Sequence, residues 1–314
     1  MSAMSNICLG FDTSNYTTSA AAVSDVGYIN EREILDVLSG NRGLRQSDAL
    51  FRHVKNMPGI YSALCEKIDL KEVCAVGVST KPRSVEGSYM PVFLAGIMQA
   101  SAVFNSLNVP CFEFSHQDGH IMAGVYSSGL ELSEEPFISV HLSGGTTEIL
   151  KTVYNGYNFD CEILGATKDI SAGQVIDRVG VAGGLKFPCG AELDRLSRES
   201  TRDVVLPVSV KGGFFNFSGL ETKAVQKLEE FDLRDISKAV FSAVSKTLFE
   251  ALMYCVNKTG INKILIAGGV ASNSLLRDTL ISISGAKVYF ASTELSSDNA
   301  VGIALCAKKA MERN

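Results

Sequence analysis

Two histidines stand four residues apart in the segment 115–120, and the chain has only four histidines in all. On a helical turn, residues at this spacing share one face, so His116 and His120 would present both imidazoles to one point. Two imidazoles so placed form half of a metal site, the plainer alternative being a pair of partly exposed polar residues. Zinc peptidases use a glutamate directly after the first histidine as general base. Here that residue is Gln117, which cannot accept a proton, so we exclude a peptidase.

A third metal ligand must come from elsewhere, and Asp298 has the best context for it. This residue lies in the polar segment 296–300, after a predicted strand at 287–290 and before the C-terminal helix. Two imidazoles and one carboxylate suit iron and zinc about equally well. We therefore predict one divalent metal ion, iron or zinc, bound by His116, His120 and Asp298.

The other two histidines have no predicted chemical role. His141 lies between Val140 and Leu142 in an apolar strand, which indicates a histidine of the core. His53 lies in a predicted helix, and the sequence names no partner for it.

Two glycine pairs follow apolar strand candidates. Ser143-Gly144-Gly145 follows the run 137–142, and Gly268-Gly269 follows the run 263–267 and leads into a helix near 272–283. A strand, two glycines and a helix offer backbone amides and a helix N-terminus to a phosphate. One such pair is more simply a tight turn, but two facing pairs predict a nucleotide cleft.

The elements that must position these residues repeat one arrangement. The runs 7–11 and 20–23 predict a hairpin whose turn, 12–18, carries one carboxylate and several hydroxyls; the runs 137–142 and 148–153 predict a second hairpin. This repeat predicts a duplicated α/β architecture. The intervening elements are predicted as strands at 73–78 and 109–112, helices at 50–64 (interrupted by Pro58), 92–107 and 236–255, and a hinge at 124–136.

Composition fits a soluble protein with a substantial core. The 314 residues carry a formal charge of −5, with 46% hydrophobic and 20% charged residues, which excludes a disordered or polybasic chain. We find no apolar run long enough to span a bilayer and no secretory signal. The eight cysteines are scattered, which indicates reduced thiols and a cytoplasmic location.

Several segments occur in the order found in one known family. They are Asp12-Thr13-Ser14, His116-x-x-x-His120, Leu142-Ser143-Gly144-Gly145-Thr146, Ala172-Gly173-x-x-x-Asp177, Phe215-Asn216-Phe217-Ser218-Gly219-Leu220, Ala267-Gly268-Gly269-Val270-Ala271-x-Asn273 and Ser297-Asp298-Asn299-Ala300. On these segments the chain resembles the transferase subunit of the tRNA threonylcarbamoyladenosine synthase, a family once labelled glycoproteases. The resemblance covers nearly the whole chain.

The resemblance implies a fold and a reaction. The fold is the duplicated actin-like, sugar kinase and Hsp70 (ribonuclease H-like) fold, with two lobes around a nucleotide cleft. We expect lobes at 1–130 and 131–298, and a C-terminal helix at 299–314 that could pack back on the first. The reaction transfers a threonylcarbamoyl group from its adenylate to the N6 amine of the adenine beside the anticodon in tRNA. Helper proteins of the synthase complex are the implied partners, with no membrane.

The resemblance also implies roles for individual residues. The metal ligands match His116, His120 and Asp298, and we take Asp12 and Ser14 as catalytic candidates. Residues predicted to hold the adenylate are Leu142, Ser143, Gly144, Gly145, Thr146, Asp177, Gly190, Asp194, Gly268, Gly269 and Asn273. Carboxylates such as Asp177 and Asp194 suit ribose hydroxyls, although either could instead cap a helix or lie on the surface.

The chain departs from the family pattern around the acceptor site. Thr146 stands in place of a histidine, and Cys189 in place of a glycine. Gln174 and Ile170 replace acidic residues, and the segment 81–83, Lys-Pro-Arg, replaces a Gly-Pro-Gly loop. We expect Lys81 and Arg83 to crowd the usual adenine or to recruit a more acidic acceptor.

Three other functions remain open on the sequence. One is another carbamoyl transferase on the same scaffold, which uses a carbamoyl-adenylate and transfers the carbamoyl group to a small molecule or a protein. The second is a nucleotide-binding partner without turnover. The third, a sugar or acetate kinase, ranks low because the histidine pair has no role in phosphoryl transfer. Metal content and transfer of labelled carbamoyl to tRNA would separate them.

Overall fold

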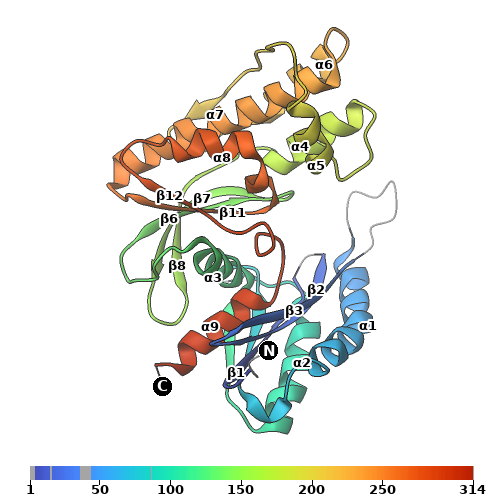
Figure 1. The fold of residues 1–314 in the computed structure, drawn as a ribbon, viewed down its shortest axis with the longest axis vertical. Helices are drawn as coiled ribbons and strands as arrows, with labels where there is room; N and C mark the ends of the chain where they lie inside the picture. The colour runs from blue at the N-terminus through green and yellow to red at the C-terminus, as the bar shows by residue number, and fades with distance from the viewer. Residues whose placement is uncertain (1–3, 15, 36–43, 86, 314) are drawn as a thin grey trace.

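The chain forms two five-stranded sheets, each flanked by helices. Helices α3 (His116–Ser128) and α9 (Val301–Met311) lie between the two sheets (Figure 1). The computed structural model describes residues 4–14, 16–35, 44–85 and 87–313. Asn15, inside the turn predicted at 12–18, lies outside the described residues, as do the terminal residues 1–3 and 314.

The first sheet has the order β3-β2-β1-β4-β5. Its strands are β1 (Ile7–Asp12), β2 (Thr17–Ser24), β3 (Gly27–Ile34), β4 (Val73–Lys81) and β5 (Cys111–Ser115). The first three strands pair antiparallel, and β4 and β5 continue the sheet in parallel with β1. The predicted hairpin is therefore confirmed, and β3 is an additional strand.

The second sheet repeats this arrangement as β8-β7-β6-β11-β12. Its strands are β6 (Phe137–Leu142), β7 (Thr147–Tyr154), β8 (Phe159–Ala166), β11 (Lys263–Ala267) and β12 (Lys287–Phe290). Again three antiparallel strands are followed by two parallel ones. The duplicated α/β architecture predicted from the two hairpins is confirmed by this shared order.

Helices cover the sheets on both sides (Figure 1). The first half contains α1 (Gln46–Cys65), α2 (Phe93–Leu107), α3 (His116–Ser128) and a short turn at Leu70–Glu72. The second half contains the helices α4 (Ala172–Ala182), α5 (Gly190–Ser197), α6 (Ser218–Lys227), α7 (Leu233–Thr259) and α8 (Ser274–Ile281). It also contains a turn at Gly269–Ser272 and a small hairpin of β9 (Val210–Lys211) and β10 (Phe214–Phe215). The chain ends in α9 (Val301–Met311).

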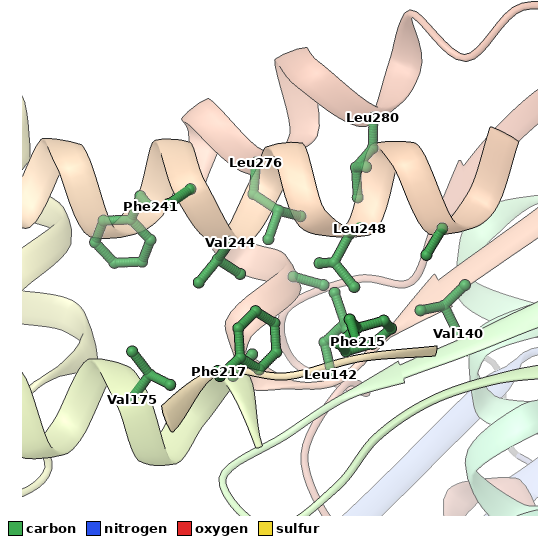
Figure 2. Packing of buried hydrophobic residues seen from close by; sticks show 14 of the residues in the cluster. Val140, Leu142, Val175, Phe215, Phe217, Phe241, Val244, Leu248, Leu276 and Leu280 are labelled. Carbon is green, nitrogen blue, oxygen red and sulfur yellow. The ribbon is translucent and has the colours of Figure 1, made fainter. Parts of the chain in front are cut away.

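The largest core cluster lies between α7 and the second sheet. Figure 2 shows Val244 and Leu248 of α7 facing Leu142 and Phe215, all fully or almost fully buried. By length and composition α7 could cross a membrane, but 67% of its apolar stretch is buried inside the protein. We therefore assign α7 to the core.

The C-terminal helix packs on the first sheet. A Cβ added at Gly10 would lie 2.4 Å from the Ala300 carbonyl oxygen, and one at Gly77 would lie 2.7 Å from the Ile303 oxygen. Only glycine permits so close an approach of helix and strand. We propose lobes at 1–130 and 131–298, with the segment 299–314 belonging to the first lobe in space.

Two local expectations differ from the structure. Helix α1 runs unbroken through Pro58, because Met57 and Ile60 are buried and hold both sides of the proline on the core. The predicted hinge at 124–136 is partly helical, since α3 continues to Ser128 and ends at Gly129, whose φ is +73°. At Gly124 the helix packs closely on β11, since a Cβ there would lie 3.1 Å from the Leu265 side chain.

Candidate active site

Helix α3 starts with a fixed first turn that carries both predicted metal histidines. The Asp118 amide donates to Ser115 Oγ at 3.2 Å, and the Ser115 amide donates to Asp118 Oδ2 at 2.8 Å. This reciprocal capping sets where the helix begins. His116 and His120 lie one turn apart, with ring centroids separated by 4.3 Å. Both imidazoles therefore face one point, between the two halves of the molecule.

Asp298 reaches the same point from the loop before α9. Its Oδ1 lies 3.2 Å from His120 Nε2 and 3.7 Å from His116 Nε2. The next residue, Asn299, anchors the loop by donating to the Ser297 carbonyl at 2.7 Å and accepting from the Val301 amide at 3.0 Å. The ligand triad thus consists of two side chains on a helix and one on a tethered loop.

These three side chains fit a metal ion. One candidate ligand atom from each lies within 4.8 Å of the other two. Ligands bound to one zinc ion at about 2.0–2.2 Å lie about 3–4 Å apart, so the spacing needs little adjustment. Two imidazole nitrogens and one carboxylate oxygen are donors that both zinc and iron accept.

The turn between β1 and β2 supports this triad from behind. His116 Nδ1 donates to Asp12 Oδ2 at 2.7 Å, and Ser14 Oγ lies 2.8 Å from the same nitrogen. The Ser14 amide in turn donates to Asp12 Oδ1 at 2.8 Å. With Nδ1 bound to Asp12, the Nε2 of His116 is the nitrogen left for a metal. The two catalytic candidates therefore contact a ligand of the metal site.

Asp12 and His116 form an ion pair in which each partner shifts the pKa of the other. Burial would raise the pKa of Asp12, but the charge and hydrogen bond of His116 lower it below its ordinary value. Burial would likewise lower the pKa of His116, whereas the charges of Asp12 and Asp298 raise it to about 9. Asp298 also has a lowered pKa, since its contacts with His120 and His116 outweigh its burial.

His141 belongs to this site, so its assignment to the apolar core is wrong. Its ring centroid lies 4.7 Å from that of His120, in an edge-on contact. Burial, together with the charges of His120 and His116, lowers the pKa of His141 to about 3, so its imidazole is neutral. Strand alternation could have revealed this, because the side chains of Val140 and Leu142 point to the face opposite to His141. His53, in contrast, lies in the first half, with its Nδ1 2.8 Å from Thr18 Oγ1.

The turn between β6 and β7 presents backbone rather than side chains. Gly144 and Gly145 are exposed, and a Cβ on either would meet nothing within 4 Å. The turn closes through the Ser143 amide, which donates to the Thr146 carbonyl at 2.9 Å. A Cβ on Gly173, in the first turn of α4, would lie 2.6 Å from Gly144 Cα, so the turn lies against a helix N-terminus. Such a surface suits an anion.

The second glycine pair abuts the first. Gly268 has a φ of +107°, and a Cβ there would lie 2.1 Å from the Leu142 carbonyl oxygen. The ends of β6 and β11 therefore touch, while Gly269 remains open, with nothing within 4 Å of a Cβ. The two predicted turns do lie side by side.

The remaining nucleotide candidates form two pairs on neighbouring elements. Asp177 of α4 accepts the Cys189 amide at 2.8 Å, directly before Gly190 begins α5, and burial raises the pKa of this carboxyl. Asp194 of α5 accepts a hydrogen bond from the Asn273 side chain. Asn273 also caps α8 by accepting the Leu276 amide at 2.9 Å.

At the rim, Arg83 is already paired. Its Nη2 lies 2.6 Å from Glu148 Oε1 on β7, so the pair joins the first half to the second. The expected positive rim is thus partly neutralised by a residue that the sequence analysis did not single out. Glu148 could have been found from the hairpin register, which sets it directly opposite His141.

The chain is similar in sequence to known proteins. A family model described as tRNA N6-adenosine threonylcarbamoyltransferase matches residues 37–305. A tRNA N6-adenosine threonylcarbamoyltransferase from Sulfurihydrogenibium sp. (strain YO3AOP1) is 29% identical over 315 residues, covering 96% of this chain and 90% of that protein. A "Probable bifunctional tRNA threonylcarbamoyladenosine biosynthesis protein" from Thermoplasma acidophilum is 30% identical over 312 residues, covering 96% of this chain and 55% of that protein.

Among solved structures, a ROK family glucokinase from Streptomyces griseus superposes with a TM-score of 0.53 at 13% identity. The alignment covers 98% of this chain and 99% of the glucokinase. At that identity the likeness concerns the fold alone, and it confirms the predicted actin-like and sugar kinase architecture.

Proposed function

The chain belongs to the tRNA N6-adenosine threonylcarbamoyltransferase family, and we propose how its two halves divide that reaction. The protein transfers a threonylcarbamoyl group to adenosine in tRNA. In our proposal the first half and α3 hold a metal ion, and the second half holds the adenylate that donates the group. The acceptor is the adenine beside the anticodon.

The observation that carries this proposal is the convergence at α3. His116, His120 and Asp298 offer ligand atoms within 4.8 Å of one another, with Asp12 bonded to His116 behind them. Strand β6 connects this point to the glycine turn, because His141 beside the metal site precedes Ser143 by only two residues. Two residues of strand span about 7 Å. A metal and a phosphate bound at these places would therefore lie close enough to act on one donor molecule.

Each residue near the metal would have a positioning task. Asp12 keeps a proton on Nδ1 of His116 and thereby directs Nε2 toward the ion. Ser14 contacts the same imidazole and restrains the ring. A bound iron or zinc would polarise the carbamoyl carbonyl and stabilise negative charge that develops on its oxygen.

The donor side would rely on backbone groups and three polar side chains. Gly144, Gly145 and Gly269 have open space where a Cβ would stand, so a phosphate can approach their amides. Asp177 would accept a ribose hydroxyl, and Asp194 with Asn273 would hold the remainder of the nucleoside. Leu142, Thr146, Gly190 and Gly268 would shape the surrounding backbone.

We propose that the reaction takes place in the cytoplasm with helper proteins that make or deliver the donor. The bifunctional relative, whose name describes threonylcarbamoyladenosine biosynthesis, supports a multi-component pathway. All eight cysteines are free thiols, which agrees with a reducing compartment.

Reconstitution with threonylcarbamoyl-adenylate, tRNA and the helper proteins, followed by nucleoside analysis, tests the proposal. We expect the modified adenosine to form with the unaltered protein and not with a variant that lacks both metal histidines. A variant at Lys263, at the far end of β11 from the glycine turn, serves as the matched control. Formation of the product without His116 and His120 would refute the assigned metal role.

A further inference from the structure

Arg83 is fixed beside the metal centre by its neighbours in the chain. The Gln117 amide donates to the Pro82 carbonyl at 3.1 Å, and Ser84 Oγ donates to Asp118 Oδ2 at 3.2 Å. Gln117 and Asp118 both lie between the two metal histidines in the first turn of α3. The backbone of Arg83 is therefore attached to the helix that carries the metal ligands.

The Arg83 side chain crosses from the first half to the second. Its guanidinium lies 2.6 Å from Glu148, and the side chains are 39% and 13% exposed, respectively, so the arginine is the partner open to solvent. Glu148 pairs directly with His141 across β6 and β7, and opposed residues of an antiparallel pair share one face. Since His141 contacts His120, the ion pair borders the metal centre.

An arginine in this position can exchange its partner. A guanidinium binds phosphate with the same two-pronged geometry that it uses for a carboxylate. Because the Arg83 side chain is partly exposed, solvent can replace part of its interaction with Glu148 when the ion pair opens. RNA brings a phosphate at every nucleotide, and phosphate contacts supply much of the affinity for nucleic acids.

We propose that Arg83 binds a backbone phosphate of the acceptor tRNA next to the modified adenosine, and that Glu148 occupies Arg83 until the RNA displaces it. This inference rests on the proposed function, because it assumes a tRNA acceptor. Arg83 is then a substrate-positioning residue at the mouth of the site, and Glu148 is its internal competitor. The Lys-Pro-Arg segment replaces a small loop by a phosphate contact rather than merely crowding the adenine.

The competing explanation is a structural brace between the halves, and the two make different predictions. If the pair is only a brace, removing either partner should change tRNA affinity in the same direction. If phosphate displaces Glu148, removing Arg83 should weaken tRNA binding, whereas removing Glu148 should strengthen it.

The test is tRNA affinity of the full-length, metal-loaded protein, measured by fluorescence anisotropy at several salt concentrations. We expect Arg83→Gln to raise Kd about 5–10-fold and to reduce the slope of log Kd against log salt by about one phosphate contact. Glu148→Gln should lower Kd about 2–5-fold, because one competing charge is removed. The control Lys263→Gln breaks the 2.7 Å pair with Glu135 at the opposite end of β11 and should leave Kd unchanged.

A charge-exchanged double variant, Arg83→Glu with Glu148→Arg, guards against a general folding defect. It restores the ion pair, so a brace predicts recovery of tRNA affinity, whereas phosphate exchange predicts that affinity stays low. Same-direction shifts in the two single variants, or recovery in the double variant, would overturn the inference. Threonylcarbamoyl transfer by the unaltered protein, measured in parallel, would show that the proposed function still stands. Absence of tRNA binding by the unaltered protein would overturn both.

Discussion

The turn between β1 and β2 and the turn between β6 and β7 occupy the same place in two sheets of equal strand order. Their chemistry is opposite. Asp12, Thr13 and Ser14 are 1%, 0% and 3% exposed, respectively, and their polar groups are hydrogen-bonded. Gly144 and Gly145 are exposed, with open space where side chains would stand.

This difference matches the two ligands of the proposed function. A metal ligand needs a defined protonation state, and a buried carboxylate beside His116 supplies it. A phosphate needs donors that it can approach closely, and side-chain-free amides supply those. Under the proposed function, the buried turn of the first half would support a metal ligand, and the exposed turn of the second half would bind a phosphate.

The largest effect should come from removing the metal ligands. Replacing His116 and His120 together by alanine leaves Asp298 as a single ligand, so we expect complete loss of bound metal and of transfer. Metal content by elemental analysis measures this directly. Gln117→Ala, on the same turn of α3, is the control and should keep its metal. Full metal occupancy in the double variant would show that the metal is not bound by these histidines of the first half.

Next in size is a backbone effect at the second turn. Gly268→Ala forces a positive φ and a contact with the Leu142 carbonyl, so the free energy of unfolding should fall by about 2–4 kcal/mol. Gly145→Ala, in open space, should change it by less than about 0.5 kcal/mol yet weaken adenylate binding. Denaturant unfolding and calorimetry separate the two outcomes. Equal loss of stability in both variants would show that the open turn is not preformed.

Asp177→Ala should weaken binding of the adenylate by about 1.5–3 kcal/mol if the carboxylate accepts a ribose hydroxyl. Part of any loss of stability would come from the Cys189 amide, which bonds to Asp177. Isothermal calorimetry with a stable adenylate analogue gives the affinity, and a thermal scan gives the stability. Unchanged affinity would remove Asp177 from the nucleotide site.

Asp12→Asn should lower metal affinity about 10–100-fold, because it removes the charge that holds His116 in its ligating form. Competition with a chromophoric chelator measures the affinity. The nucleotide affinity of this variant should stay close to that of the unaltered protein. A metal affinity that does not change would mean that the buried turn supports the fold rather than the metal.

The smallest effect concerns Asp169, an exposed carboxylate in the second half. It accepts the amides of Ile170 and Phe217 at 2.7 and 2.8 Å. Burial would raise its pKa, but these backbone hydrogen bonds lower it below the ordinary 3.8. Because its pKa is lower in the folded protein, the Asp169 carboxylate contributes to the free energy of unfolding above pH 3.8. That contribution is lost as the pH falls below 3.8 and the carboxylate is protonated.

Asp169→Asn should therefore cost about 1 kcal/mol at neutral pH, reduced for solvent exposure. Urea unfolding of both proteins across the acid range is the measurement. The difference should begin to shrink below pH 3.8. If the difference in the free energy of unfolding does not depend on pH, the loss in Asp169→Asn comes from altered geometry and not from the lost charge.

Much of the fold could be predicted because its signals are local. The strands 263–267 and 287–290 have the predicted bounds, and α7 ends at Gly260, whose φ is +71°. The strand β3 was missed because its burial is only partial. Its residues include several polar and charged ones, so the sequence lacks the apolar run that predicts β1.

Site residues were predictable where spacing or a motif carried them, as for His116 and His120. The apolar neighbours of His141 point to the opposite face of the strand, so they do not indicate its surroundings. The hairpin register places Glu148 opposite His141. Its pair with Arg83, however, joins residues 65 positions apart, and nothing local in the sequence indicates that contact.

Anomalous diffraction from crystals grown with the metal and a stable adenylate analogue tests the division between the two turns most directly. We predict one anomalous peak bounded by His116 Nε2, His120 Nε2 and the Asp298 carboxylate, with the adenylate phosphate on the amides of Gly144 and Gly145. A metal bound elsewhere, or a phosphate bound at the Asp12 turn, would contradict the account.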